Sequence, residues 1–550
     1  MTQPKIYPLC ETALTVIWGD TIDKDIRRRV QHLNGLLKQN PFTGFIETLP
    51  AYTSLTVFYA PEMIRMGNVS PFQFVEAHIK NLFGEAPAGN SEPENIISIP
   101  VCYEAEFAPD LELVATSGGL SKEEVIERHL RKIYTVYMMG FLPGFAYMGE
   151  VDDTIAAPRK PTPRALVEEG SVGIAGKQTG IYPLPSPGGW QIIGRTPLCL
   201  FDLQKSDPFL IRTGDKVQFN AITKEAFVKI KNEQEQKVER KPEEQVADAV
   251  VIKPGVFSTF QDRGRLGFLA YGVPLSGAMD LPAHCLANAL AGNTKNAATI
   301  ECAMGGLSIQ FKKQAVIAVT GTGDAFVNGQ KIRSYQPLGV SKNDMLEIRY
   351  NGDGIRTYIA VRGGFAATDI MNSKSACLRA GIGTALIKEE ELWFGEAVSP
   401  TLKRLQDNVT IPVHTAAVHI RIMEGIEMNR MEPESVQQLY AQPFTLSNRS
   451  DRMGCHLLGE PLSLNETREL VSTAVTKGTI QLTPGGQLIV LMNDCQTTGG
   501  YPRVAQVVAA DLPLLAQLRP GDTLRFTNIS FGEAEELYLM QQKNIDAFFG

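Results

Sequence analysis

Loops rich in glycine, arginine and amide side chains are the parts of this 550-residue sequence best suited to chemistry. Glycine lets backbone N–H groups approach a ligand, and the arginine fork binds a carboxylate or phosphate with two hydrogen bonds. An anionic or amide-bearing small molecule suits such loops, although glycine and proline turns can also merely shape the corners of a β-barrel. The loops are residues 140–149, 158–164, 173–183 and 186–197, then 259–267, 272–280, 450–454 and 493–502.

Standard catalytic signatures are missing from the sequence. The string GSVGIAGK (170–177) resembles a P-loop, but Ser171 occupies the position of its first glycine and Gln178 that of its Mg²⁺-binding hydroxyl. H-E-x-x-H, G-x-S-x-G and a biotin-attachment lysine are also missing, and the seven histidines are scattered, so we predict no metal site. His129 shares an apolar helical stripe and is predicted to be a hydrogen-bonded core or interface residue rather than a general base.

Composition favours an ordinary globular, mostly β protein. The chain is 43% hydrophobic and 21% charged, with net charge −7, 49 glycines and 33 prolines. It has no basic block, no signal peptide and no long apolar run, so we expect neither nucleic acid nor membrane as a partner. Its eight cysteines form no C-x-x-C pair and indicate reduced thiols in a cytoplasmic protein.

The loops must be positioned by several domains, because the chain is too long for one core. The run KIKNEQEQKVERKPEEQVAD (229–248) is almost free of large apolar residues and divides the chain as a charged linker. Before it we predict a small α+β domain (1–92) with helical stripes near 22–37 and 72–82, and a β domain (93–228) with one helix capped by Ser121 and Glu124. After it we predict two β domains (249–375 and 376–550), with a helix near 280–291 and hairpin-like strands beyond it.

An internal echo links the halves. RTGDKVQFNAIT (212–223) aligns with RPGDTLRFTNIS (519–530), and PGGWQIIG (187–194) with PGGQLIVL (484–491). Residues 342–349 form a weaker third copy. Chance recurrence of Gly-Asp turns before strands is the alternative, but two matches in the same order favour related β domains.

The same loop strings carry a resemblance to known families. Residues 5–225 resemble allophanate hydrolase subunit 1, also called the B subunit of 5-oxoprolinase or sporulation-kinase inhibitor, through VCYEAEFAPDL, GFLPGFAYMG, GSVGIAGKQTGIYP and SPGGWQIIGRTP. Residues 250–535 resemble the partner family, allophanate hydrolase subunit 2 or the C subunit of 5-oxoprolinase, through FQDRGRLG, GVPLSGAMD, SDRMG and QTTGGYP. One departure is residues 372–392, where the family usually carries a Gly-Gly-x-x-Gly-Arg stretch, which puts a ligand role for that loop in doubt.

The resemblance implies cyclophilin-like β-barrel domains preceded by a small α+β domain, and two partners that assemble side by side. It implies the fused B and C part of an ATP-dependent 5-oxoprolinase, which opens 5-oxo-L-proline to L-glutamate with a separate A subunit. ATP would be a co-substrate, with or without Mg²⁺, and no biotin would be attached to this chain. The chemistry should lie where loops of both halves meet.

Site residues follow from residue chemistry on the matching motifs. We predict catalytic roles for Asp262, Asp280, Asp494 and Gln496, and substrate or ATP contacts for Arg159, Arg164, Gln178, Tyr182, Arg195, Arg265, Asp451, Arg452 and Tyr501. No general base is assigned. Two alternatives stay open: the carboxyltransferase part of a biotin-dependent urea carboxylase, and a non-enzymatic regulator of a histidine kinase. A homo-oligomer is also open.

Overall fold

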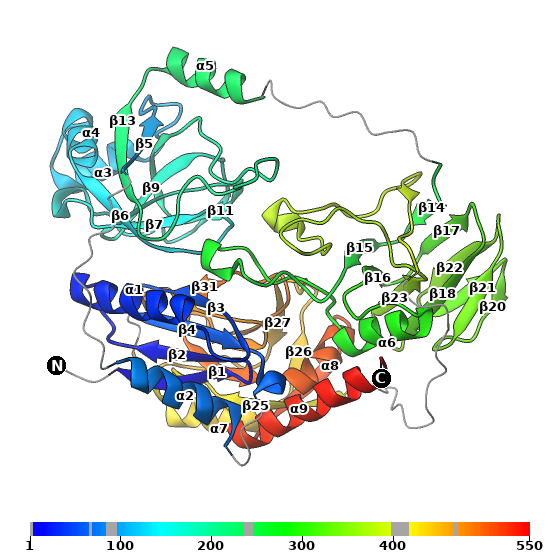
Figure 1. The fold of residues 1–550 in the computed structure, drawn as a ribbon. Helices are drawn as coiled ribbons and strands as arrows, with labels where there is room; N and C mark the ends of the chain where they lie inside the picture. The colour runs from blue at the N-terminus through cyan, green and yellow to red at the C-terminus, as the bar shows by residue number, and fades with distance from the viewer. Residues whose placement is uncertain are drawn as a thin grey trace.

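The protein is mainly β, as predicted. The computed structural model describes residues 4–64, 69–83, 96–235, 246–397, 417–466 and 470–549. Strands dominate these ranges, and a few helices cover the outside of the sheets (Figure 1). Among the described helices, none combines the length and apolar character needed to cross a membrane.

The first sheet has the antiparallel order β1-β2-β4-β3, from β1 (Lys5–Cys10), β2 (Ala13–Ile17), β3 (Phe45–Pro50) and β4 (Ser54–Tyr59). Helices α1 (Lys24–Gln39) and α2 (Pro71–Leu82) bear the two predicted apolar stripes and pack on it through buried side chains including Leu33 and Ile79. Ser70 and Gln73 form a capping box at the start of α2, which satisfies backbone N–H groups that the first turn leaves free.

The second sheet has the order β12-β9-β10-β7-β6-β13-β5. Its strands are β5 (Ile96–Val101), β6 (Ile133–Met139), β7 (Ala146–Gly149), β9 (Ser171–Ala175), β10 (Gln178–Ile181), β12 (Gln191–Arg195) and β13 (Lys216–Ala221). Helices α3 (Leu111–Gly118) and α4 (Lys122–Leu130) lie beside it, and α4 begins at the predicted Ser121–Glu124 capping box. Strands β8 (Arg164–Val167) and β11 (Ser186–Gly188) form a separate ribbon.

His129 is a core histidine, which confirms the prediction. Its Nδ1 lies 2.8 Å from the Tyr103 hydroxyl and its Nε2 lies 3.1 Å from the Thr179 hydroxyl. Its ring stacks on Phe219, and burial lowers its pKa to about 3. Both ring nitrogens are engaged inside the core, and the imidazole stays neutral there.

Two sheets and a helix follow the charged run. One sheet has the order β20-β19-β22-β17-β14-β24 and the other β15-β16-β23-β18-β21. Their strands are β14 (Ala249–Pro254), β15 (Phe257–Gln261), β16 (Thr299–Ala303), β17 (Leu307–Phe311), β18 (Ala315–Gly321), β19 (Asp324–Val327), β20 (Gln330–Lys331), β21 (Pro337–Val340), β22 (Met345–Arg349), β23 (Arg356–Val361) and β24 (Glu391–Leu392). Helix α6 (Leu281–Ala291) occupies the predicted range, with Asp280 as its N-cap and Gly292 as its C-cap.

A closed barrel ends the chain, in the order β25-β32-β29-β30-β27-β26-β33. It comprises β25 (Ala417–Glu424), β26 (Phe444–Leu446), β27 (Gly454–Leu458), β29 (Thr479–Leu482), β30 (Leu488–Leu491), β32 (Arg503–Val507) and β33 (Thr523–Asn528). Helices α7 (Pro433–Ala441), α8 (Leu512–Gln517) and α9 (Phe531–Ala547) accompany it.

The first pair of echoed strings, 212–223 and 519–530, occupies equivalent places. Strand β13 pairs in parallel with β5, and β33 pairs in parallel with β25. A helix follows each: α5 (Lys224–Glu235) after β13 and α9 after β33. The third string forms β22, whose pairings are antiparallel. Helix α5 enters the predicted linker, and residues 236–245 of that linker lie outside the described residues.

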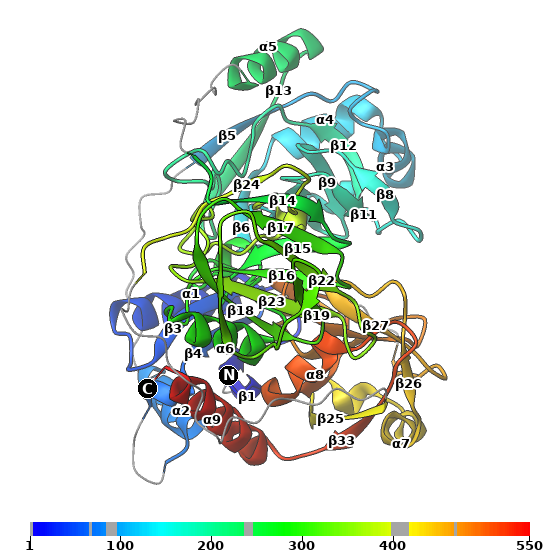
Figure 2. The same cartoon turned by 90° about the vertical axis from the view of Figure 1, so that its right-hand side faces the viewer.

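The chain folds back so that its first sheet packs against its last barrel (Figures 1 and 2). Phe72 and Phe531 meet with ring centroids 5.1 Å apart, and the Phe72 N–H donates to Glu535 at 3.0 Å. In the β1–β2 turn of the first sheet, buried Glu11 accepts the N–H of Ala509 from the second half at 2.7 Å. We call the whole contact region between residues before and after the linker the seam.

Candidate functional site

A short ribbon of the second half reaches into the seam. It pairs β28 (Thr473–Ala474) with β31 (Thr498–Gly499) and carries the QTTGG part of a predicted loop. Ala474 packs with Leu9 and Cys10 of the first sheet, whereas Val471 packs on an aromatic cluster of the second sheet. A Cβ placed on Gly140 would lie 2.0 Å from Thr498 Oγ1, so glycine is required for this approach.

The aromatic cluster forms the first half's wall of this site. It contains Tyr52 from the β3–β4 turn and Tyr137, Phe145, Tyr147, Tyr182 and Trp190 from the second sheet. The Tyr52 ring lies 5.4 Å from the Tyr137 ring and 6.3 Å from the Tyr147 ring. The contact with Tyr147 is edge-on and the contact with Tyr137 is tilted, and together they restrict the orientation of the Tyr52 ring.

Several hydroxyls at this place lack partners. Tyr52, Thr497 and Thr498 each bury a side-chain oxygen that finds no hydrogen-bond partner within the described part of the chain. Burial raises the pKa of Tyr147, while Arg159 and the hydroxyls of Thr498 and Ser472 pull it down, which places these groups together. Unsatisfied buried hydroxyls cost free energy, so these oxygens are candidate contacts for a polar ligand.

Five of the predicted residues lie at or beside this surface. Arg159 is exposed, and its charge acts on the pKa of Tyr52, Tyr147 and Tyr182. The other four are Tyr182 within the aromatic cluster, Gln178 opposite Gly149 in the β10–β7 pair, Gln496 beside Gly499, and the half-exposed Tyr501. We call Tyr52, Tyr147, Arg159, Tyr182, Gln496 and Thr498 the composite site, and Gln178 and Tyr501 lie beside it.

Arg164 and Arg195 hold loops of the second sheet. Arg164 donates to Asp110 at 2.7 Å, and Arg195 donates to the Glu169 carbonyl at 2.7 Å. Burial alone would raise the pKa of Asp110, but Arg164 and Lys160 outweigh it and lower that pKa. One nitrogen of Arg164, Nη1, is buried without a partner in the described ranges, so it retains a free donor.

Arg452 and Asp494 belong to a buried network inside the second half. The guanidinium binds Asp494 with two hydrogen bonds of 2.8 and 2.9 Å and Glu301 with one of 2.6 Å. Tyr358 also donates to Glu301, at 2.7 Å. Burial favours the neutral carboxyl of Glu301, yet Arg452 and Arg356 outweigh it and lower its pKa. The network therefore links residues on both sides of position 376, the predicted boundary between the two β domains of the second half.

Asp262 and Arg265 fix the loop that departs from the family pattern. Asp262 accepts from the hydroxyls of Ser373 and Ser375 and from the Lys374 N–H, with distances of 2.5–2.8 Å. Arg265 is fully buried and donates to the Ser375 carbonyl at 2.9 Å. These contacts give residues 373–375 an internal structural role.

Asp280 and Asp451 are placed by their local backbone. Asp280 caps α6 by accepting the Ala283 N–H and also accepts from Gln517 at 2.9 Å. Burial raises its pKa to about 6. Asp451 accepts two N–H groups of its own turn and pairs with exposed Arg379 at 3.2 Å.

Sequence reasoning did not select Tyr52, Tyr147 or Thr498 as site residues. Tyr147 and Thr498 lie inside the quoted strings GFAYMG and QTTGGYP, so the motifs contained that signal. Tyr52 lies in AYTS, which has no distinguishing pattern, and only the fold brings it to the seam.

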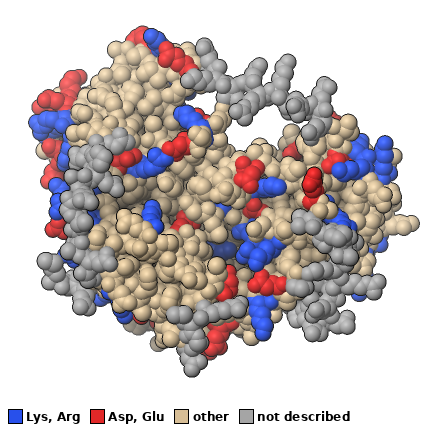
Figure 3. Space-filling view, viewed as in Figure 1, with Lys and Arg blue, Asp and Glu red and all other residues tan. Residues whose placement is uncertain are grey.

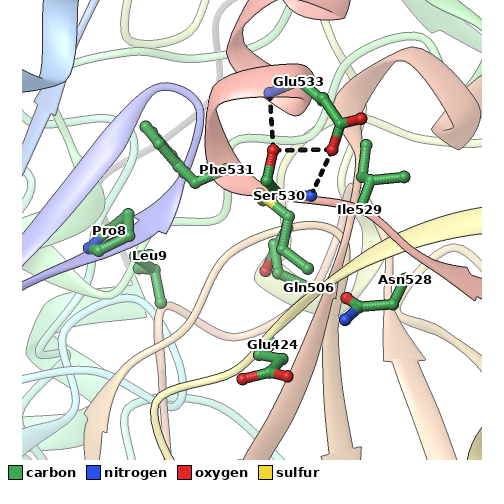
Figure 4. Close-up of a pocket in the computed structure, with 10 residues that line it drawn as sticks. Pro8, Leu9, Glu424, Gln506, Asn528, Ile529, Ser530, Phe531 and Glu533 are labelled. Atoms are coloured by element: carbon green, nitrogen blue, oxygen red, sulfur yellow. Dashed lines mark hydrogen bonds between the residues drawn. The ribbon is translucent and has the colours of Figure 1, made fainter.

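A pocket of about 440 Å³ lies at the outer edge of the seam (Figure 4). Pro8 and Leu9 of β1 face Glu424, Asn528 and the first turn of α9 across it. Ser530 and Glu533 also line the pocket, but their side chains already form the capping box of α9, in which each accepts the backbone N–H of the other. None of the predicted site residues lines this pocket. In the described ranges, no group of three or more His, Cys, Asp or Glu side chains could hold a metal ion.

The seam also predicts a pH effect. Glu47 accepts the Gly267 and Leu269 N–H groups at 2.7 and 2.9 Å, and burial raises its pKa to about 7. The folded protein then binds a proton that the unfolded chain releases near pH 4.5, so this contribution to stability is complete below pH 4.5 and lost as pH rises through 7. The free energy of unfolding of the wild type should therefore fall between pH 5 and pH 8. We expect Glu47→Gln to make this fall smaller by about 1–2 kcal/mol.

Denaturant unfolding at several pH values measures this effect. Exposed Glu123→Gln on α4 is the matched control and should follow the wild type. Parallel pH curves for wild type and Glu47→Gln would contradict the assignment.

Comparisons with known proteins agree with the two-part arrangement. The family model "Carboxyltransferase domain, subdomain C and D" matches residues 4–211, and "Carboxyltransferase domain, subdomain A and B" matches residues 271–528. The chain is 43% identical over 233 residues to the 5-oxoprolinase B subunit of Bacillus subtilis (strain 168), covering 42% of this chain and 97% of that protein. It is 34% identical over 297 residues to the 5-oxoprolinase C subunit of Escherichia coli (strain K12), covering 53% of this chain and 95% of that protein.

A solved structure matches across both halves. The crystal structure of TTHA0988 has a TM-score of 0.80 and 31% identity, covering 94% of this chain and 99% of that chain. The Kluyveromyces lactis urea amidolyase structure, at 22% identity and TM-score 0.53, shares the fold over 74% of this chain and 27% of its own length.

Fold, seam and comparisons together define a two-part protein of carboxyltransferase domains, with subdomains C and D ahead of A and B. The chain belongs to the family of the 5-oxoprolinase subunits, with a half that resembles the B subunit fused to a half that resembles the C subunit.

Proposed function

We propose that this chain is the fused B and C component of an ATP-dependent 5-oxoprolinase, acting with a separate homologue of the A subunit. The observation that carries the proposal is that each half matches one 5-oxoprolinase subunit over nearly all of that subunit's length. The seam supports it, because both halves supply side chains to the composite site. Fusion keeps the two halves at high effective concentration.

The composite site suits a small cyclic amide acid. The exposed Arg159 guanidinium would pair with a carboxylate, and the hydroxyls of Tyr52, Tyr147 and Thr498 would donate to amide oxygen. Lactam hydrolysis is slow because resonance stabilises the amide. ATP would supply the activation by phosphorylating the amide oxygen, which gives water a leaving group to displace.

The predicted arginines fit a triphosphate poorly. Arg164, Arg195, Arg265 and Arg452 all donate to carboxylates or carbonyls of the chain itself. Of these four, only Arg164 and Arg265 keep a buried nitrogen without a partner in the described part. We propose loop-holding roles for them, and derive no ATP contact from them.

The test mixes the purified chain with an A-subunit homologue, 5-oxoproline and ATP, and follows glutamate. We expect ATP-dependent glutamate formation that neither component gives alone. The proposal is wrong if the mixture forms no more glutamate than either component alone.

A second function, the carboxyltransferase part of a urea carboxylase, is favoured by the names of both family models and by urea amidolyase of Lachancea kluyveri, 28% identical over 54% of this chain. The matched region is 18% of that relative's length. Carboxyl transfer to urea from a biotin carrier supplied in trans, in the absence of 5-oxoproline activity, would select this function instead.

A further inference from the structure

A strained turn lies beside the composite site, in the loop after β6. The Leu142 N–H donates to the Gly140 carbonyl at 2.7 Å, and Phe141 between them has φ +66°. A hydrogen bond that spans one residue of positive φ defines the rare, strained kind of γ-turn. Positive φ is exceptional for a side chain as bulky as phenylalanine. Such strain persists only where surrounding contacts impose it, and it concentrates at functional sites.

The second half holds this turn at both of its ends. A Cβ on Gly140 would lie 2.0 Å from Thr498 Oγ1, and a Cβ on Gly272 would lie 2.4 Å from the Leu142 carbonyl. Both residues that approach the turn, Thr498 and Gly272, belong to the second half. Phe141 is therefore fixed between two seam contacts, and its backbone has little room to relax.

The Phe141 ring extends the aromatic wall of the composite site. Its centroid lies 5.4 Å from that of Phe145 and 6.2 Å from that of Tyr182, and both contacts are edge-on. The Phe145 ring in turn lies 4.8 Å from the Tyr147 ring. Phe141 remains partly exposed. The turn thus holds the ring against Tyr182 of the composite site and leaves part of its surface available to a ligand.

Apolar side chains of both halves accompany this ring. Leu142 from the first half and Val471 from the second half are also partly buried, and both pack on the same aromatic cluster. Small-molecule sites typically combine such apolar walls with a few polar groups that fix the orientation of the ligand. Charged side chains of both signs are interspersed over the visible face of the molecule (Figure 3), so shape rather than a single-sign field must discriminate between ligands.

We propose that Phe141 is a specificity-determining residue of the composite site, with its ring against the hydrocarbon part of a small cyclic amide acid. Arg159 and the site's hydroxyls recognise a carboxylate and an amide, which lactam acids of every ring size carry. The apolar wall therefore measures ring size, because a wall that cannot retreat excludes extra methylene groups. The inference rests on the proposed function in taking a lactam acid as the ligand.

Phe141→Gly removes the ring and keeps the turn, because glycine adopts a φ of +66° without steric penalty. In the assay with the A-subunit homologue and ATP, we expect the KM for 5-oxoproline to rise about tenfold, with kcat nearly unchanged. The preference in kcat/KM for 5-oxoproline over its six-membered lactam homologue should fall about tenfold as well. Phe141→Tyr keeps the ring and should match the wild type.

Met304→Gly is the matched control. Met304 has φ +58° in the β16–β17 turn and is 43% exposed, so glycine relieves the same kind of backbone strain outside the aromatic cluster. It should leave both KM and the ring-size preference unchanged. Thermal unfolding checks that each variant is folded, and Phe141→Leu replaces Phe141→Gly if the glycine variant is not. A merely structural role for Phe141 would lower the unfolding temperature and leave the ring-size preference of the folded protein intact.

Calorimetric titration of 5-oxoproline into the intact chain separates this inference from the proposed function. Wild-type binding that Phe141→Gly weakens about tenfold, without any glutamate formation, would support the role of Phe141 and refute the function. Glutamate formation with unchanged KM and ring-size preference in Phe141→Gly would overturn the role of Phe141 and leave the function standing. A wild type that neither binds nor converts either lactam acid would overturn both.

Discussion

Replacing Arg452 with methionine should lower the free energy of unfolding by about 3–5 kcal/mol. The residue is 9% exposed, and among the described cations its guanidinium alone is bonded to both Asp494 and Glu301. Methionine fills much of the volume but leaves two carboxylates buried without their shared counter-charge. Chemical denaturation of the intact chain measures the loss.

The neighbouring pair Arg379–Asp451 is the control. It also links the two parts of the second half, at 3.2 Å, but both side chains are about half exposed. Arg379→Met should therefore change stability by less than about 1 kcal/mol. If both substitutions lowered the free energy of unfolding equally, the buried network of Arg452 would not be what stabilises the second half.

Gly272→Val should separate the two halves. Gly272 has φ +78°, and a Cβ there would lie 2.4 Å from the Leu142 carbonyl of the first half. The Gly144 N–H also donates to the neighbouring Tyr271 carbonyl across the seam, at 3.0 Å. A branched side chain adds backbone strain of about 1–3 kcal/mol and a collision with main-chain atoms that cannot rotate away. We expect at least a hundredfold loss of ATP-dependent glutamate formation in the presence of the A-subunit homologue.

Cutting the linker reveals the separation. A protease site inserted within residues 236–245 allows cleavage followed by size-exclusion chromatography. The cleaved wild type should elute as one complex and cleaved Gly272→Val as two fragments. Gly381→Val is the matched control, because Gly381 also ends a 3-10 turn, with φ +68°, but has no atom within 4 Å of a Cβ. Co-elution of the Gly272→Val fragments would contradict the seam.

Local patterns predicted helices α1, α2, α4 and α6 but missed α3, α7, α8 and α9. The Ser121–Glu124 capping box starts α4, while Asp280 starts α6 and Gly292 stops it, because helix caps act within a few residues. The aligned Gly-Asp strings likewise predicted strands β13 and β33, but not their parallel pairing with β5 and β25.

Strand partnership was harder to predict. The segments of β22 and β23 read as hairpin-like neighbours, but they lie in different sheets: β22 pairs with β17 and β19, whereas β23 pairs with β16 and β18. Alternating apolar residues show that a strand has a buried face, and do not show which strand lies beside it.

The predicted site residues likewise fall into two groups, one at the seam and one in the interior. Motif glycines and arginines selected the candidate loops, but whether each loop lies at the seam or in the interior depends on tertiary packing. Asp262 and Arg452 satisfy their charges inside the second half, whereas Tyr52 reaches the composite site only because the first sheet packs against the ribbon. The cyclophilin-like assignment, the domain boundaries and the catalytic roles stay predictions.

A double-mutant cycle across the seam tests the central claim that chemistry occurs where the halves meet. The measurement is kcat/KM for ATP-dependent glutamate formation from 5-oxoproline, with the A-subunit homologue present, in Tyr147→Phe, Thr498→Val and the double variant. We predict that each single change lowers kcat/KM at least tenfold and that the double costs much less than the product of the two. Single variants that match the wild type would contradict the claim.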